Sequence, residues 1–311
     1  MEGPLKGTVL LAEDTLVNQQ VALAMLESLG CLVEIAANGR EALDALARRP
    51  FDSVVMDCRT PDMDRLEATR RVRAREASRG NDERGMMNDE RGEENKQSAV
   101  QHSSFSIQHW PHIPIVALTA HAGERDRADC LAVGMDDFLA KPVCREELRT
   151  MLARHLPPVA RAPESGQPGP AEAAHGHVEP AAGGAPPVLA PQALEQLRAL
   201  QQGSRPDLIA RVINVYLTDA PRLLAAMRDA VRRGDASALE QAAHSLKSSS
   251  AALGAGALSA CCKELEVMGH AKALARAETL LVQAEAGYRA AGEALTDYLA
   301  RQTGDRMVDA R

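Results

Sequence analysis

The sequence has few aromatic residues and no long apolar run. Phe, Trp and Tyr make up only 2% of the 311 residues, so the cores must be built mainly from Leu, Val and Ala. No apolar stretch reaches the ~18 residues that span a bilayer, so we expect no membrane span. The N-terminus lacks a basic region followed by an apolar one, which predicts no export signal. The net charge of −7 disfavours nucleic acid as a direct partner.

The six cysteines show no CxxC spacing, and the adjacent pair Cys261 and Cys262 is poorly placed for a disulfide. They are predicted to be small buried residues in a reducing compartment, which favours a cytoplasmic location. The length predicts two domains.

Residues 5–156 alternate five strand signals with five helix signals, which predicts an α/β doubly wound parallel sheet. The third helix is expected over Leu66–Glu76. Residues 78–111 break the alternation of strands and helices, because they are polar and contain the motif Asn-Asp-Glu-Arg-Gly twice. We predict a disordered insertion there.

Residues 157–187 are rich in Pro, Ala and Gly and are predicted to form a flexible linker. From 188 to 303 the sequence is rich in Ala and Leu, and no strand signal interrupts it. This predicts an all-α helical bundle.

Polar residues follow four apolar runs of the predicted sheet. Glu13 and Asp14 follow the first run, Asp57 ends the third, and Thr119 and Lys141 follow the last two. The carboxyl ends of parallel strands meet at one edge, where ligands bind. Converging carboxylates need a cation, and oxygen ligands without Cys or His favour Mg²⁺. Asp57 could then act as a nucleophile toward phosphorus, with Thr119 and Lys141 contacting the phosphoryl oxygens.

These segments resemble the receiver domain of two-component response regulators, most closely receivers attached to hybrid histidine kinases. The matching motifs are Leu11–Asp14, Val55–Cys58, Ala117–Ala120 and Met135–Pro142. The resemblance implies a (βα)5 flavodoxin-like fold, Asp57 as the phosphoacceptor, and Mg²⁺ held by Glu13, Asp14, Asp57 and the backbone carbonyl of Arg59. It also implies that Thr119 and Lys141 contact the phosphoryl group. Arg65 stands where such receivers usually carry glycine, so backbone strain is expected there.

A second site is predicted on the helix that begins at Ala236. Its apolar stripe comprises Leu239, Ala243, Leu246, Ser250 and Leu253. His244 lies roughly 140° from the middle of that stripe, so we expect it to face solvent. A neutral imidazole is a competent nucleophile near pH 7, and the ammonium of Lys247, one turn on, could neutralise a phosphoryl group.

The segment Ala243–Ala255 and its continuation through Leu258, Cys262, Leu265 and Glu266 resemble the histidine-phosphotransfer (HPt) domain. The resemblance implies a four-helix bundle in which His244 is phosphorylated. Ser248 stands where the family usually has glycine.

Together the two resemblances predict a phosphorelay signalling protein, a phosphoryl-transfer intermediate without a kinase catalytic domain. The expected partners are a histidine kinase as phosphodonor and the receiver domain of another response regulator. The linker would also allow exchange between Asp57 and His244 of one chain. Two alternatives stay open. One is an interaction protein whose relay has decayed, and the other is a haloacid-dehalogenase-like phosphatase, although such enzymes place a second acid two residues after the nucleophile, where this chain has Arg59.

Overall fold

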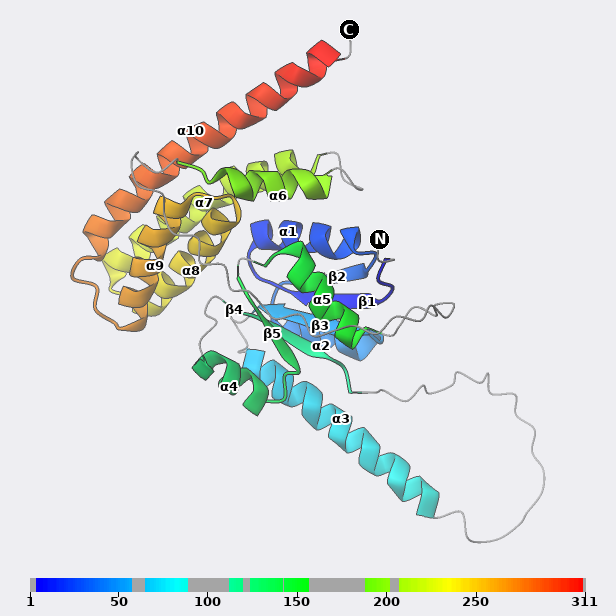
Figure 1. The fold of residues 1–311 in the computed structure, drawn as a ribbon. Helices are drawn as coiled ribbons and strands as arrows, with labels where there is room; N and C mark the ends of the chain where they lie inside the picture. The colour runs from blue at the N-terminus through cyan, green and yellow to red at the C-terminus, as the bar shows by residue number, and fades with distance from the viewer. Residues whose placement is uncertain are drawn as a thin grey trace. The chain divides into compact units, whose positions relative to one another are not determined.

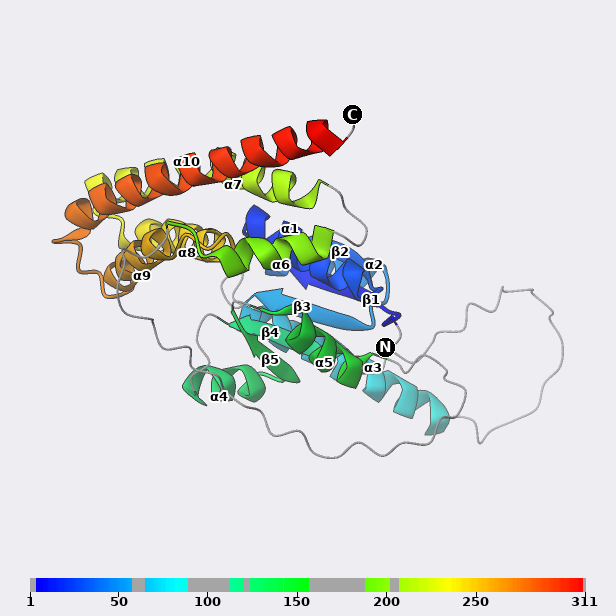
Figure 2. The same ribbon diagram turned by 45° about the horizontal axis from the view of Figure 1, so that its top comes forward.

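The computed structural model describes residues 4–57, 65–88, 112–119, 124–141, 143–156, 188–201 and 207–309. The chain divides into two compact units, Met1–Pro157 and Pro158–Arg311, each described here by itself (Figures 1 and 2). The predicted linker and the carbonyl of Arg59 lie outside the described residues.

The first unit is built on a five-stranded parallel sheet of order β2-β1-β3-β4-β5. The strands are β1 (Thr8–Ala12), β2 (Leu32–Ala36), β3 (Ser53–Asp57), β4 (Ile115–Thr119) and β5 (Asp137–Ala140). Every residue of β3 and β4 is buried, as expected for strands covered on both faces. This order is that of flavodoxin-like doubly wound folds, which confirms the predicted fold class.

Five helices cover the sheet: α1 (Leu16–Ser28), α2 (Gly39–Arg48), α3 (Arg65–Asn88), α4 (Glu124–Ala132) and α5 (Arg145–His155). Buried residues of α2, α3 and α4 share one core with alternate residues of β1, β3 and β4. Figure 1 shows α1 and α5 on the opposite face. The side chain of Arg145 donates a hydrogen bond to Ser28 Oγ (3.0 Å), which joins the start of α5 to the end of α1.

The third helix differs from its prediction. It continues from Arg65 to Asn88, so the expected end at Glu76 and the expected disorder from residue 78 are wrong as far as Asn88. The prediction relied on the missing apolar period, which reports burial rather than helicity, and Arg, Glu, Ala and Met are good helix formers. Residues 89–111 lie outside the described residues. Arg65 begins the helix, and Lys272 is the only described non-glycine residue with a positive φ, so the strain expected at Arg65 is not found.

One polar cluster ties α3 to the starts of β4 and β5. The guanidinium of Arg73 donates to Glu76 (2.8 Å), to Asp136 (2.7 Å) and to the carbonyls of Ile113 (2.9 Å) and Gly134 (2.7 Å). His112 also pairs with Asp136. The cluster therefore ties the middle of α3 to the residues that lead into β4 and β5.

The described residues of the second unit are helical apart from short connections. The helices are α6 (Pro191–Gln201), α7 (Leu208–Arg233), α8 (Ala236–Ala252), α9 (Gly256–His270) and α10 (Ala277–Asp309). α8 packs against α7 and α9, and α10 closes the bundle against the same two helices, which confirms the predicted bundle. The predicted stripe of α8 is fully buried, and the hydroxyl of Ser250 in that stripe is hydrogen-bonded to Tyr216 (3.1 Å).

Among the described residues, no helix is both long and apolar enough to cross a membrane.

Candidate functional site

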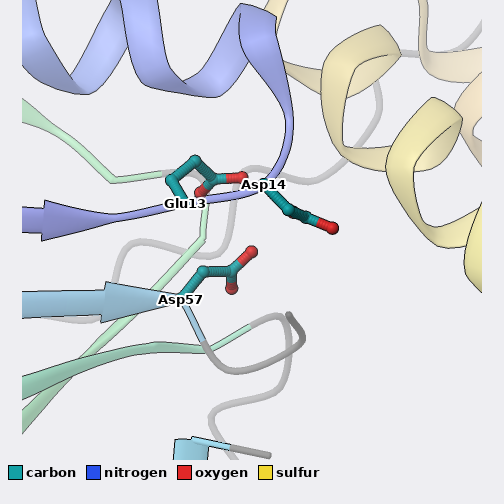
Figure 3. A group of neighbouring side chains, drawn as sticks. All are labelled: Glu13, Asp14 and Asp57. Carbon is teal, nitrogen blue, oxygen red and sulfur yellow. The ribbon is translucent and has the colours of Figure 1, made fainter. Parts of the chain in front are cut away.

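Three carboxylates meet at the C-terminal edge of the sheet. Glu13 and Asp14 directly follow β1, and Asp57 is the last residue of β3. Because β1 pairs with β3 in parallel register, one carboxylate oxygen of each residue lies within 4.8 Å of the others (Figure 3). Glu13 and Asp57 are buried, whereas Asp14 is half-buried. The sequence prediction that these three acids converge is therefore met.

The ammonium of Lys141 lies between two of these carboxylates. Its Nζ is 2.8 Å from Oε2 of Glu13 and 2.8 Å from Oδ2 of Asp57, although only the contact to Glu13 has the alignment of a hydrogen bond. The position of Lys141 is set by the backbone, because its N–H donates to the carbonyl of Thr119 (2.7 Å). The end of β5 thus delivers the cation to the acids at the ends of β1 and β3.

Burial and mutual repulsion perturb the protonation of this cluster. Burial and the nearby charge of Asp57 raise the pKa of Glu13 to about 7, against the lowering effect of Lys141. Burial alone would lower the pKa of Lys141, but Asp57 and Glu13 outweigh it and raise that pKa above its ordinary value. Glu13 therefore takes up a proton more readily than a free carboxyl does, mainly because it is buried.

Thr119 completes this edge as the last residue of β4. It is 5% exposed, and the register places the preceding Leu118 opposite Asp57. The hydroxyl thus ends the strand next to the one that carries Asp57, as predicted.

The second cluster lies between α8 and α9. Nδ1 of His244 is 2.6 Å from Oε1 of Glu266, and Nζ of Lys247 donates to Oε2 of the same carboxylate (2.6 Å). The side chains of His244, Lys247 and Glu266 are 7%, 11% and 6% exposed. Burial alone would raise the pKa of Glu266, but the hydrogen bonds from His244 and Lys247 lower it to about 2. Glu266 is therefore ionised across the physiological range.

An ionised carboxylate fixes the tautomer of the neighbouring imidazole. Since Glu266 can only accept, Nδ1 of His244 must be the donor, so Nε2 carries the lone pair whenever the ring is neutral. Nε2 is buried and has no hydrogen-bond partner among the described residues. The pair thus presents an imidazole nitrogen in its nucleophilic form.

Two families match the chain, one over each unit. The response regulator receiver domain matches residues 9–82 and 103–153, and the Hpt domain matches residues 211–301. The chain carries a receiver domain followed by an Hpt domain. The receiver match omits residues 83–102, which lie inside the predicted insertion.

Several relatives share one or both domains. Sensor histidine kinase GacS of Pseudomonas protegens is 27% identical over 97% of this chain and 27% of its own length. Probable histidine kinase 1 of Oryza sativa is 34% identical over 49% of this chain, and the match spans 16% of that protein. The crystal structure of the receiver domain of a sensor histidine kinase from Pseudomonas aeruginosa, with a magnesium ion in its active-site cleft, is 36% identical over 49% of this chain and 98% of that one, with a TM-score of 0.35. The chain thus spans well under a third of both curated kinases.

The Hpt site corrects one sequence prediction. His244 was expected to face solvent, but it is buried. That expectation rested on the apolar stripe of α8 alone, and it could not include the adjacent α9, whose Glu266 binds both His244 and Lys247. Ser248 on the same helix is half-buried, and Ala251 is exposed.

Glu266 is the residue of the Hpt site to which sequence analysis assigned no role. A signal for it was present, because Leu258, Cys262 and Leu265 form the buried stripe of α9 and Glu266 lies four residues after Cys262. An acid on a buried stripe requires a cationic or hydrogen-bonding partner. His244 and Lys247 were the available candidates on the preceding helix.

Proposed function

We propose that this chain is a phosphorelay signalling protein in which Asp57 accepts a phosphoryl group and His244 exchanges phosphoryl groups with a receiver aspartate. The observation that carries the proposal is that one chain holds both halves of such an exchange. Asp57 lies beside the ammonium of Lys141, and the pairing of Nδ1 with Glu266 puts the lone pair of the neutral His244 ring on Nε2. The matches to the receiver and Hpt families support it.

At the receiver, a carboxylate oxygen of Asp57 attacks the phosphorus of a phosphohistidine on a histidine kinase. The new O–P bond forms as the N–P bond breaks, and the kinase imidazole leaves with the electron pair. Lys141 offsets the negative charge on the transferring oxygens, and the hydroxyl of Thr119 donates to one of them. These roles extend the contacts that the structure gives Lys141 and Asp57.

The acidic cluster fits Mg²⁺, and we propose that Glu13, Asp14, Asp57 and the carbonyl of Arg59 hold it. All three carboxylates offer hard oxygen ligands within 4.8 Å of one another. When bound, the ion would neutralise the carboxylates and the phosphoryl oxygens.

At the Hpt domain, the lone pair of Nε2 attacks the phosphorus of an aspartyl phosphate. The N–P bond forms, the O–P bond breaks, and the aspartate leaves as a carboxylate. The ring becomes cationic in this step, and Glu266 stabilises it through the hydrogen bond from Nδ1. Because Nε2 is buried, transfer requires a rearrangement that uncovers this nitrogen.

The partners implied are a histidine kinase and a receiver domain, either on another protein or on this chain. We place the receiver domain at residues 5–156, the linker at 157–187 and the Hpt domain at 188–303. A flexible tether of this kind gives effective concentrations near millimolar, which would favour exchange within one chain. The cysteines that the structure describes are free thiols, in keeping with a reducing cytoplasm.

Labelling of the full chain with radioactive acetyl phosphate tests the proposal. We expect label on Asp57 that alkali removes, followed by acid-labile, alkali-stable label on His244. Asp57→Asn should abolish both forms, and His244→Gln should abolish only the second. Asp52→Asn is the matched control, because Asp52 is an exposed acid that bonds the N–H of Thr8 away from the site.

Label that reaches Asp57 but never His244, either within the chain or from a separate phosphorylated receiver, would leave a simple receiver and remove the relay. The absence of label on Asp57 would favour an interaction protein with a decayed relay. Multiple turnover of a small phosphate ester would instead favour the phosphatase.

A further inference from the structure

A cavity of about 400 Å³ lies between α2 and α3, apart from the residues of the acidic cluster. It is lined by Arg40, Leu43 and Asp44 from α2 and by Arg71, Ala74 and Arg75 from α3. These residues recur at spacings of three and four, so each helix turns one face toward the cavity. Its volume is within the range of small-molecule sites, ~300–1,000 Å³.

The cavity is cationic in a chain whose net charge is −7. Among the described residues, no ion pair joins Arg40, Asp44 or Arg75 to another side chain, so Asp44 does not occupy the N–H donors of these arginines. Arg71 donates its Nε to Glu67 (2.9 Å), which turns part of its charge away from the cavity. Two unpaired guanidinium groups from different helices therefore lie at one cavity. Both arginines are exposed, so their N–H donors are open to an anion from solvent.

The lining is chemically mixed. Arg40 and Arg75 present planar forks of N–H donors, which match phosphate oxygens in bidentate fashion. Asp44 can only accept and would bind hydroxyl or amino groups. Leu43, which is 7% exposed, and Ala74 supply apolar surface against which a ring can pack.

We propose that this cavity binds a phosphorylated small molecule of nucleotide size. Its phosphate lies between Arg40 and Arg75, its hydroxyl or amino groups donate to Asp44, and its ring lies on Leu43 and Ala74. A peptide carrying several acidic side chains fits less well, because the volume suits a compact ligand. The site does not depend on the proposed relay, since none of its residues belongs to either cluster described above.

Calorimetry and methyl NMR of the full chain, followed at Leu43, test this assignment with pyrophosphate, adenosine 5′-monophosphate and adenosine as probes. We expect both anions to bind and to shift the Leu43 methyl signals, the monophosphate to bind more tightly than pyrophosphate, and adenosine to bind at least tenfold more weakly. Arg40→Gln and Arg75→Gln should each weaken monophosphate binding by about tenfold or more, the loss expected for charge-assisted hydrogen bonds.

Arg48→Gln is the control, because Arg48 lies on the same helix, carries the same charge and pairs with Glu34 outside the cavity (3.3 Å). It should leave binding unchanged, and thermal unfolding should show that all variants fold. Several results would overturn the proposal: neither anion binds, the double variant Arg40→Gln/Arg75→Gln retains the affinity, or Arg48→Gln weakens binding equally. Adenosine binding as tightly as its monophosphate would also overturn it, as would pyrophosphate binding more tightly than the monophosphate.

Discussion

Glu266→Gln should slow phosphoryl transfer at His244 without unfolding the bundle. Glutamine keeps the size of the side chain but removes its charge, and its amide can rotate to present N–H₂ to Nδ1. That rotation would move the imidazole proton to Nε2 and remove the lone pair that attacks phosphorus. The position therefore controls both the charge beside the ring and the tautomer of the ring.

The size of the effect follows from the pKa of Glu266. A lowering from 4.5 to about 2 corresponds to roughly 3 kcal/mol of preferential interaction of the ionised carboxylate with its surroundings. His244 and Lys247 share that interaction, and a hydrogen bond to a charged group ordinarily contributes about 1.5–3 kcal/mol. If this contact strengthens as the ring becomes cationic, its loss slows transfer by about tenfold or more.

The assay is transfer from a phosphorylated receiver to His244 in the full chain, with ¹⁵N NMR of the imidazole as an independent readout. The unmodified protein should show the proton on Nδ1 near neutral pH, and Glu266→Gln should shift the population toward Nε2–H. Glu240→Gln is the matched control, since Glu240 also pairs with a histidine, His270 (3.2 Å), on the bundle surface. A wild-type transfer rate in Glu266→Gln, or an Nε2–H tautomer in the unmodified protein, would refute the reasoning.

Three further predictions concern stability. The pKa of Glu13 is raised from 4.5 to about 7, so between these values the folded receiver holds a proton that the unfolded chain releases. The free energy of unfolding of the metal-free receiver should therefore fall by roughly 3 kcal/mol between pH 4.5 and pH 8. Urea unfolding of Glu13→Gln should show no such pH dependence. Lys141→Ala removes the cation that pairs with Glu13 and Asp57, so it should lower the free energy of unfolding of the metal-free receiver by about 3–5 kcal/mol. Mg²⁺ should restore much of this loss in thermal melts. A loss below ~1 kcal/mol would contradict the pairing. Leu246→Ala should lower the free energy of unfolding by about 2–5 kcal/mol, because Leu246 is fully buried in α8. Val267→Ala should change it by no more than ~0.5 kcal/mol, because Val267 on α9 is 58% exposed. Equal losses for the two variants in chemical denaturation would show that the bundle core is wrongly assigned.

The sheet and its acidic edge were predictable because their signals are local. Four apolar runs end at acidic, hydroxyl or basic residues, and the carboxyl ends of parallel strands lie at one edge of the sheet. The convergence of Glu13, Asp57 and Lys141 also needed the strand order, which the βα alternation leaves open and the resemblance to receiver domains implies. The apolar stripe of α8 was predictable for a similar reason, since periodicity reports which face of a helix is buried.

The rest depended on neighbours that local patterns do not contain. The exposure of His244 is set by α9, a separate helix, and the length of α3 is favoured by helix-forming residues that show no apolar period. Both predictions used the apolar pattern of one segment as if it described all of that segment's surroundings. Glu266 could have been predicted to contact the preceding helix. Its spacing places it on the buried stripe of α9, and a buried acid requires a cationic or hydrogen-bonding partner.

The tie made by Arg73 has an evolutionary consequence. Arg73 and Glu76 in the middle of α3 contact His112, Ile113 and Asp136, so the segment between Glu76 and His112 is closed by contacts at its two ends. Closure free energy rises only slowly with the length of the closed segment, by about 0.6 kcal/mol for each doubling of a flexible chain. The first copy of the repeated Asn-Asp-Glu-Arg-Gly motif lies within α3, so duplications in this segment can lengthen the helix while the strands on either side keep their alignment.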